Sequence, residues 1–429
     1  MRLKVYKNYL CYDDGKPFFY LGDTAWELFH KLTLEDINFY LSVRAKQGFN
    51  VIQAVALAEF DGLKEPNMYG RLPLKTINGS YSPEHPDTDG ENNYWSTVDY
   101  AVKRAGELGL FIGFLPTWGD KWNLLWGKGP EIFTPQKARS YGKWIGERYG
   151  KYENIIWILG GDRPVENDLH MAIIDEMAYG LREGESFYHL MTYHPTSPHS
   201  SADFVAGRRY IDFHITQTGH RTDECYECWK LLQYTREKEP GKPYMDGEPR
   251  YEDHPACFKV EYNYLWNAAD VRTNLWWNVL EGACGHTYGN HCVWSMNKET
   301  SDYFPYRWKD VLYHEGALTM RYARELRESR DYFSLKPAPE LVDDNGGITA
   351  HVAVAKGDGY AYIYSPMGAP VNVHFGKLGF DPVKASWFNP RNGQTKTFAI
   401  IPGHGSGLMV PPSCGKGNDW VLILDRMEP

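Results

Sequence analysis

The chain has 429 residues, of which 42% are hydrophobic and 24% are charged, so it can fold as an ordinary globular protein with a large core. Acidic residues (55) outnumber basic ones (46), and the formal net charge of −9 argues against a dedicated binder of nucleic acid or of an anionic membrane surface. The seven cysteines are an odd number, which does not indicate a disulfide scaffold and fits a reducing compartment.

Neither a membrane helix nor a signal peptide is evident. No apolar run approaches the roughly 20 residues that a membrane helix needs, and residues 1–19 lack the apolar core of a signal peptide. We expect no membrane partner, and a cytoplasmic location if Met1 is the native start; if a leader has been removed, a periplasmic or secreted location is expected instead. The sequence does not indicate an oligomeric state.

Strand signals recur along the first 330 residues. Each is a β-rich apolar run that ends in a polar or glycine-containing turn. These runs are 18–23, 50–58, 111–118, 155–162, 189–194, 212–218, 243–248 and 285–294.

Amphipathic helices fit between the strands. Thr33, Thr134 and Asn167 are predicted N-caps, with Pro135 at a first helical position and Gly48 closing the first of these helices. Further helices are expected near 222–236, 266–281 and 310–328. Alternating units of this kind predict a parallel sheet covered by helices, and eight of them predict a (β/α)8 barrel over residues 1–335. A doubly wound open sheet is disfavoured, because no glycine-rich phosphate loop opens any helix.

The sequence changes character after residue 335. Short alternating strands, separated by Gly, Pro and Asn turns, fill residues 348–425, and Gly357-Asp358-Gly359 is a hairpin signal. We predict a small antiparallel β-sandwich domain over residues 336–429, joined through a proline-containing linker near Ser334–Glu340. We expect this domain to brace the barrel, because it has no obvious aromatic platform for a ligand.

The active site of such a barrel lies at the carboxyl ends of its strands. Asp162 and Glu248 are the best acidic pair there, because each follows an apolar strand and a glycine, on strands that face each other across the barrel mouth. Two carboxyl groups that flank a bond suit glycosidic cleavage, in which one protonates the leaving oxygen and the other attacks or activates water. Each acid could instead be a helix cap or an ion-pair partner of the arginine that follows it.

The residues around these strand ends are aromatic, amide and charged side chains that suit sugar binding. The predicted substrate-binding residues are Asp23, Trp26, Gln53, Trp118, Asp120, Trp122, Arg163, His194, Gln217, Arg250, Tyr288, His291 and Trp294. For the acids the alternative is helix capping, with Asp23 or Thr24 as the cap of the first helix; for the tryptophans it is core packing. For His214, which lies in the middle of a strand, a structural role is at least as well supported as hydroxyl binding.

Other chemistries are poorly supported. No HExxH motif or other metal set occurs, so we expect no metal and no cofactor. Cys225 and Cys228 form a CxxC, but their spacing with Trp229 and Leu232 is that of one apolar helix face, which favours core packing. No GxSxG elbow occurs in the barrel.

The segments LGDTAW (21–26), WILGGDRP (157–164), PYMDGEPRYE (243–252) and WFNPRNG (387–393), with the Trp-rich loop after the third strand, resemble the apiosidase-like glycoside hydrolases, carbohydrate-enzyme family 140. The resemblance covers nearly the whole chain. It implies a (β/α)8 barrel with a small β-sandwich, and activities that include release of apiose, a branched pentose, from pectic side chains. By the same resemblance Asp162 is the acid/base and Glu248 the nucleophile. The wider clan has Asn-Glu at the end of strand 4, where this chain has Gly161-Asp162.

We therefore expect an exo-acting glycoside hydrolase on plant pectic oligosaccharides, which releases apiose. The shorter Asp162 leaves retention and inversion both open, and the roles could be exchanged or shared with Asp23, Asp120, Asp246 or Glu252. The long segment 59–96 could close one end of the site. The alternative from another class is a carbohydrate-binding protein without turnover; a transglycosylase or lyase would share the same site.

Overall fold

The computed structural model describes residues 2–221 and 227–427. Its centre is a curled parallel sheet whose neighbouring strands follow the order β10-β9-β8-β5-β4-β14-β13-β12, with β11 added antiparallel at the end. The bounds of these strands are β4 (Tyr20–Thr24), β5 (Val51–Val55), β8 (Phe111–Leu115), β9 (Ile155–Gly160), β10 (Met191–His194), β11 (His199–Ser200), β12 (His214–Gln217), β13 (Tyr244–Asp246) and β14 (Gly285–Tyr288). Each predicted barrel strand therefore exists.

The two ends of this sheet meet between β10 and β12. The backbone N–H of Asp212 donates to the carbonyl of Met191 at 2.8 Å, and the Thr192 hydroxyl donates to the carbonyl of Phe213 at 2.7 Å. The barrel is thus closed by single bonds at this seam. Longer ladders join its other neighbouring strands, except β13 and β14, which pair only at Asp246 and His286.

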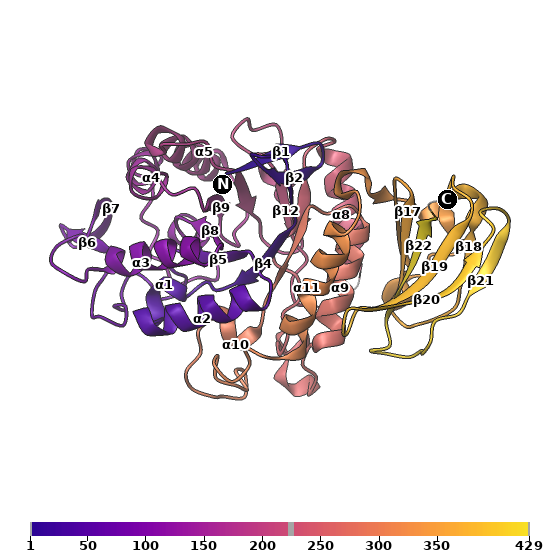
Figure 1. Ribbon diagram of the computed structural model, residues 1–429. Coiled ribbons are helices and arrows are strands. Elements are labelled where there is room, and N and C mark those ends of the chain that lie inside the picture. Colours follow the sequence, from indigo (N-terminus) through magenta and orange to yellow (C-terminus); the bar gives the residue numbers. More distant parts are fainter. Residues whose placement is uncertain (1, 222–226, 428–429) are drawn as a thin grey trace.

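Helices cover the outside of the barrel (Figure 1). They are α1 (Leu28–Lys31), α2 (Leu34–Lys46), α3 (Tyr94–Glu107), α4 (Pro135–Tyr149), α5 (Asp168–Gly184), α6 (Ala202–Val205), α8 (Cys228–Lys238), α9 (Ala268–Leu280), α10 (His291–Trp294) and α11 (Glu315–Glu328). The predicted caps are confirmed: Thr33, Thr134 and Asn167 each accept a backbone hydrogen bond in the first turn of α2, α4 and α5. The first part of the helix expected at 222–236, with Cys225, lies outside the described residues; Cys228, Trp229 and Leu232 are buried as predicted.

The prediction for 285–294 is wrong in its second half. The strand ends at Tyr288, and residues 291–294 form α10, because the Asn290 side chain accepts from the backbone N–H of Cys292 and caps a helix there. Two small sheets were not expected. The segment 59–96 contains a hairpin of β6 (Leu74–Ile77) and β7 (Ser80–Pro86), and the N-terminus forms an antiparallel sheet of β1 (Leu3–Tyr6), β2 (Tyr9–Tyr12) and β3 (Pro17–Phe18).

The C-terminal strands form antiparallel sheets beside the barrel, as the sequence predicts. One has the order β15-β16-β17-β22-β19-β20 and the other pairs β18 with β21. Their bounds are β15 (Lys336–Pro337), β16 (Ala353–Gly357), β17 (Tyr360–Ser365), β18 (Val371–His374), β19 (Val383–Asn389), β20 (Gln394–Ile401), β21 (Ser406–Met409) and β22 (Trp420–Arg426). The hairpin at residues 357–359 is confirmed, with Gly359 at φ +80°. The domain boundary at residue 335 stays a prediction.

These sheets pack on α9 and α11, which stand between them and the barrel (Figure 1). Tyr360, Tyr362 and Tyr364 on β17 belong to the same buried cluster as Ile156 and Met245 of the barrel strands. The two parts therefore share one hydrophobic core.

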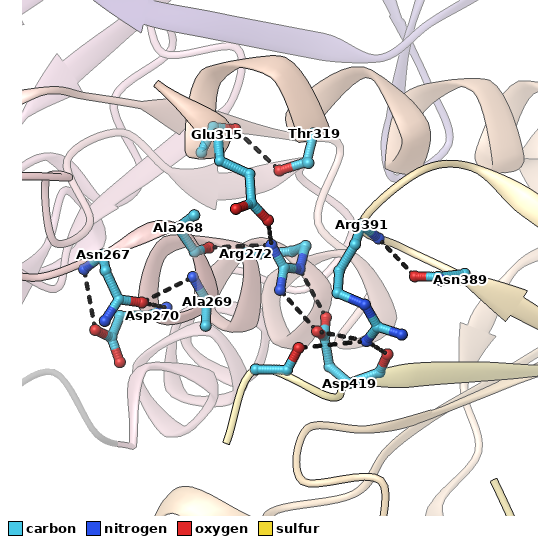
Figure 2. Close-up of polar contacts among 12 residues, drawn as sticks. Asn267, Ala268, Ala269, Asp270, Arg272, Glu315, Thr319, Asn389, Arg391 and Asp419 are labelled. Atoms are coloured by element: carbon cyan, nitrogen blue, oxygen red, sulfur yellow. Dashed lines mark hydrogen bonds and ion pairs between the residues drawn. The ribbon is translucent and has the colours of Figure 1, made fainter. Parts of the chain in front are cut away.

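A buried ion pair joins the two parts (Figure 2). Asp419, just before β22, takes a bidentate hydrogen bond from Arg272 of α9, at 2.8 and 2.9 Å. Arg391 also reaches the carboxylate of Asp419, at 3.3 Å, and Glu315 lies 3.4 Å from Arg272. Bidentate arginine–carboxylate pairs combine strength with a fixed orientation, so this contact sets how the C-terminal sheets sit on α9.

Among the residues that the structure describes, no helix has both the length and the apolar character that crossing a membrane requires.

Candidate active site

A pocket of about 620 Å³ opens at the carboxyl ends of the barrel strands. Its walls come from the loops that follow successive strands, as expected for this fold. The lining residues are Trp26, Lys31, Glu59, Phe60, Trp118, Trp126, Asp162, Thr196, Ser197, Gln217, Gly219, His220, Arg221, Glu248, Tyr251, His254, Phe258, Trp294, Ser295, Asn297, Tyr303 and Phe304. Both predicted catalytic acids are among them.

Asp162 is turned into the pocket by an unusual backbone path. Gly160, Gly161 and Asp162 have φ values of +88°, +106° and +55°, so three successive residues lie in the left-handed region. A Cβ at Gly160 would come within 2.3 Å of the His194 carbonyl oxygen, so only glycine fits against β10 there. A non-glycine residue held at positive φ costs energy and is typical of functional sites.

The carboxyl group of Asp162 is partly exposed in the pocket and has an arginine behind it. Arg163 is fully buried; its Nη1 donates to the Asp162 carbonyl at 2.7 Å and lies 3.4 Å from the carboxylate. The ring of Trp126 covers the guanidinium at 4.3 Å. Burial, and then the negative charge of Glu248, raise the pKa of Asp162 to about 7, although Arg163 opposes this rise. Asp162 can thus hold a proton near neutral pH.

Asp246 fixes the backbone turn that carries Glu248. The backbone N–H of Glu248 donates to the Asp246 carboxylate at 3.3 Å, and that carboxylate also accepts from the Thr218 hydroxyl at 2.6 Å. The carbonyl of Gly247, between the two acids, accepts from the Gln53 amide at 3.0 Å. These bonds fix the turn that presents Glu248 to the pocket.

Two histidines lie against the carboxylate of Glu248. His220 Nε2 lies 3.2 Å from Oε1 and His194 Nε2 lies 3.0 Å from Oε2. Burial alone would raise the pKa of Glu248, but the contacts with His194 and His220 outweigh it and lower the pKa to about 2. Glu248 is therefore ionised at the pH where Asp162 is protonated.

A third carboxyl group, that of Glu59, lies near Asp162 and was not predicted as a site residue. Glu59 follows β5, and its carboxylate lies 3.4 Å from Arg163 Nη2, so this arginine touches both acids. Burial, and then the charge of Asp162, raise the pKa of Glu59 to about 8. The pocket thus holds two acids with raised pKa values and one with a lowered value.

Aromatic rings surround the acids. Of the predicted substrate-binding residues, Trp26, Trp118, Gln217 and Trp294 line the pocket. The rings of Trp26 and Trp118 lie 5.1 Å apart and both pack against His194. Trp126 was not predicted, yet it is the most exposed of these rings, with 58% of its surface accessible.

The other predicted substrate-binding residues lie behind the lining. They are Asp23, Gln53, Asp120, Trp122, Arg163, His194, Arg250, Tyr288 and His291. Asp23 is neither a wall nor a helix cap, because its carboxylate bonds to Arg44 and Tyr40 at 2.5 Å each. Asp120 pairs with the buried Lys121 at 2.6 Å and accepts from the backbone N–H of Gly129.

The remaining ones have packing partners. Trp122 packs edge-to-face on His170 below the pocket, and Arg250 covers the ring of Trp266 at 4.8 Å. The Tyr288 hydroxyl donates to Glu252 at 2.5 Å, and His291 stacks on Phe304 at 4.5 Å. His214, in β12, pairs with the Ser201 hydroxyl at 2.7 Å, which is the structural role considered for it.

No group of three or more His, Cys, Asp or Glu side chains among the described residues is arranged to hold a metal ion.

Comparison with known proteins places this geometry in context. The model of the family "Apiosidase-like, catalytic domain" matches residues 5–334, and a second model, named for collagen binding in a collagenase, matches residues 337–425. No curated protein matches the chain in sequence.

Solved structures resemble nearly the entire chain. A glycoside hydrolase is 28% identical, covers 99% of this chain and 97% of its own, and has a TM-score of 0.89. A family 5 glycoside hydrolase from Bacteroides vulgatus is 27% identical, covers 99% of this chain and 92% of its own, and also has a TM-score of 0.89. An endo-1,4-β-D-mannanase from Thermotoga petrophila is 12% identical, with a TM-score of 0.52 over 72% of this chain and 100% of its own, and shows the barrel fold alone.

Proposed function

The chain belongs to the apiosidase-like family of glycoside hydrolases, and from this premise we propose that it is an exo-acting enzyme that releases apiose from pectic side-chain oligosaccharides, with Asp162 and Glu248 as its catalytic pair. The family's name and the sequence resemblance support this substrate. The catalytic assignment rests on this chain's own residues.

One observation carries the assignment: the surroundings of the two acids shift their pKa values in opposite directions. Asp162 has a pKa of about 7, and Glu248 one of about 2. A pair of carboxyl groups separated in this way supplies one proton donor and one anion at the same pH, which is what glycosidic cleavage requires.

Each of the two acids has its own role in the proposed mechanism. The proton of Asp162 passes to the glycosidic oxygen while the bond from that oxygen to the anomeric carbon breaks. The Glu248 carboxylate stabilises the oxocarbenium-like transition state and then either bonds to the anomeric carbon or takes a proton from the attacking water. Asp162, now ionised, sits beside Arg163, which compensates the new charge.

The aromatic rings supply binding energy for the sugar. We assign Trp26, Trp118 and Trp294 to contacts with the apolar faces of the ring, and Gln217 to a sugar hydroxyl. The predicted residues behind the lining position these groups: Gln53 holds Gly247, and His194 lies against Glu248.

Exo action is supported by the shape of the site. Phe60, Trp126 and Trp294, the last residue of α10, line the pocket from segments that follow three different strands, and we infer that they favour a chain end over the middle of a long polymer. The C-terminal sheets brace the barrel through their shared core with α9 and α11.

A release assay tests this function. The protein is incubated with apiose-bearing pectic side-chain oligosaccharides and with an aryl apioside, and the products are identified by mass and by sugar analysis. We expect free apiose, lost in both Asp162→Asn and Glu248→Gln. Asp168→Asn and Glu237→Gln, at exposed positions of α5 and α8, are matched controls that keep the activity.

The outcomes separate the parts of the proposal. Release of internal fragments without apiose would overturn the exo assignment. Release that persists in either variant would overturn the catalytic pair. Glycan binding without any release, equal in wild type and variants, would favour a binding protein.

A further inference from the structure

A second pocket adjoins the active site and has no assigned role. Its volume is about 430 Å³, and it shares Lys31, Glu59, Phe60 and Asn297 with the active-site pocket. Its own lining residues are Glu27, His30, Asp61, Glu65, Pro66, Met68, Met296, Lys298 and Glu299. The two pockets thus share part of their walls.

The shared wall lies on the Asp162 side of the active site. Glu59 is joined to Asp162 through Arg163, with 3.4 Å contacts from that arginine to each carboxylate. Glu248 is instead surrounded by His194 and His220. A substrate that extends from the active site past Glu59 therefore runs along the side of Asp162, the acid proposed to protonate the leaving oxygen.

The side pocket has the mixed lining that a sugar ring requires. Phe60 and Met68 offer exposed apolar surface, with 39% and 47% of their surfaces accessible. Part of its charge is paired: Glu27 contacts His30 and Asp61 contacts Lys128, while Lys31 and Lys298 add donors to a lining that also holds Glu65 and Glu299. Apolar faces beside hydrogen-bonding groups suit a hydroxyl-rich ring.

We infer that this side pocket is a second sugar subsite, which receives the ring next to the one held between Asp162 and Glu248, and that Glu59 at the junction binds a hydroxyl group of that neighbouring ring. In an exo-acting enzyme the neighbouring ring is the leaving group, so the inference rests on the proposed function. Lys31 and Asn297, the other polar residues shared by both pockets, border the same junction.

The protonation of Glu59 supports a donor role. Its raised pKa, about 8, keeps the carboxyl group protonated near neutral pH, so it can give a hydrogen bond to a sugar oxygen. An ionised carboxylate next to Asp162 could only accept, and it would also repel the charge that Asp162 gains during the reaction.

The experiment compares two substrates that share the sugar being released. One is an aryl apioside, in which a flat aryl group replaces the neighbouring ring; the other is an apiose-bearing pectic oligosaccharide. The measured quantity is the ratio of kcat/KM for the oligosaccharide to kcat/KM for the aryl apioside. A change in Asp162 affects both substrates, so the ratio isolates what happens to the neighbouring ring.

We expect Met68→Trp, which fills the side pocket, and Glu59→Ala to lower this ratio at least about tenfold, the loss typical of a well-placed binding contact. Glu59→Gln keeps an N–H donor and should retain the ratio within about threefold. Leu408→Trp, on a strand of the C-terminal sheets where 61% of the side chain is exposed, is the control for adding a surface ring and leaves the ratio unchanged. Lys298→Ala repeats the test should Met68→Trp not fold.

A ratio unchanged in Met68→Trp, Glu59→Ala and Lys298→Ala would overturn the subsite. If the wild type hydrolyses neither substrate, the proposed function fails, and calorimetry with the same oligosaccharide decides the subsite alone. A tenfold weaker Kd in Met68→Trp then supports it; equal Kd values, or no binding by the wild type, overturn it.

Discussion

His194 accepts a hydrogen bond through Nδ1 from the backbone N–H of Asp162, at 3.3 Å, and this leaves the ring proton on Nε2. Nε2 is the atom that lies 3.0 Å from the Glu248 carboxylate. The His194 imidazole therefore contacts both acid-bearing segments. The backbone N–H of Asp162 sets its tautomer, and this tautomer turns the protonated Nε2 toward Glu248. The relation suggests that His194 positions and polarises Glu248 without touching the sugar.

Replacing His194 tests this relation. His194→Phe removes a group that lowers the pKa of Glu248, so the acidic limb of the kcat/KM profile should move up by about one pH unit or more. The pH dependence of aryl apioside hydrolysis measures the shift. His194→Gln, which retains a donor, should restore part of it, and His374→Phe on a C-terminal strand serves as control. An unmoved acidic limb in His194→Phe would show a purely structural role.

The wild-type profile itself should be asymmetric. The proposed mechanism requires protonated Asp162, so kcat/KM should fall as the pH rises through about 7. It also requires ionised Glu248, so kcat/KM should fall at low pH near 2. Because the two groups interact, the observed values belong to the pair. Kinetics between pH 3 and 9, within the range in which the protein stays folded, check the basic limb.

The leaving group should separate the roles of the two acids. Asp162→Asn is expected to lower kcat about 10²- to 10⁴-fold for a substrate with a poor leaving group, and far less for a dinitrophenyl glycoside, which leaves without a proton. Glu248→Gln should impair both substrates alike. Equal losses on both substrates in Asp162→Asn would argue against its role as the acid. Rates over a series of aryl leaving groups provide the measurement.

Glu59 should reduce the stability of the protein above acidic pH. The pKa of Glu59 in the folded state, about 8, exceeds the ordinary value of 4.5, so the unfolded chain loses this proton more easily than the folded protein. The contribution of Glu59 to folding stability is therefore fully present below pH 4.5 and is lost as the pH rises through 8. Glu59→Gln is therefore expected to melt like the wild type at pH 4 and to be more stable at pH 8, by up to about 4 kcal/mol. Thermal unfolding at both pH values measures this; Glu325→Gln, exposed on α11, should show no such difference.

The ion pair between Arg272 and Asp419 should matter for stability more than for catalysis. Asp419→Ala leaves two arginines around a buried site without their carboxylate, a change that typically costs about 3–5 kcal/mol. We expect a lower Tm in thermal unfolding and unchanged kcat/KM at 25 °C. Asp358→Ala, whose partner Arg426 is exposed, is the matched control. A Tm equal to the wild type would show that the pair adds nothing.

Much of the fold can be predicted from the sequence because its local signals agree with one another. Barrel strands buried on both faces appear as continuous apolar runs, and Thr33, Thr134 and Asn167 mark helix starts. The same rule finds Asp162 and Glu248, since both come directly after a strand. The N-terminal sheet was missed because its short strands carry no long apolar run.

The environment of the site needs the tertiary structure. Glu59 follows β5 by a few residues within a segment that looks like a loop, and its partner Arg163 is 104 residues away. Trp122 and Trp126 lie in one loop, yet the first packs under the pocket and the second covers Arg163. Side-chain direction in a loop follows from the backbone around it, so composition alone does not separate the two.

Because Tyr360, Tyr362 and Tyr364 share a core with the barrel, the chain cannot be divided cleanly at the boundary between its two parts. A protein engineer who cuts between residues 335 and 336 would expose those rings together with the flank of α9, and both fragments should aggregate. A fusion of the C-terminal strands to another enzyme would therefore have to replace the apolar surface of α9 and α11 that covers these rings.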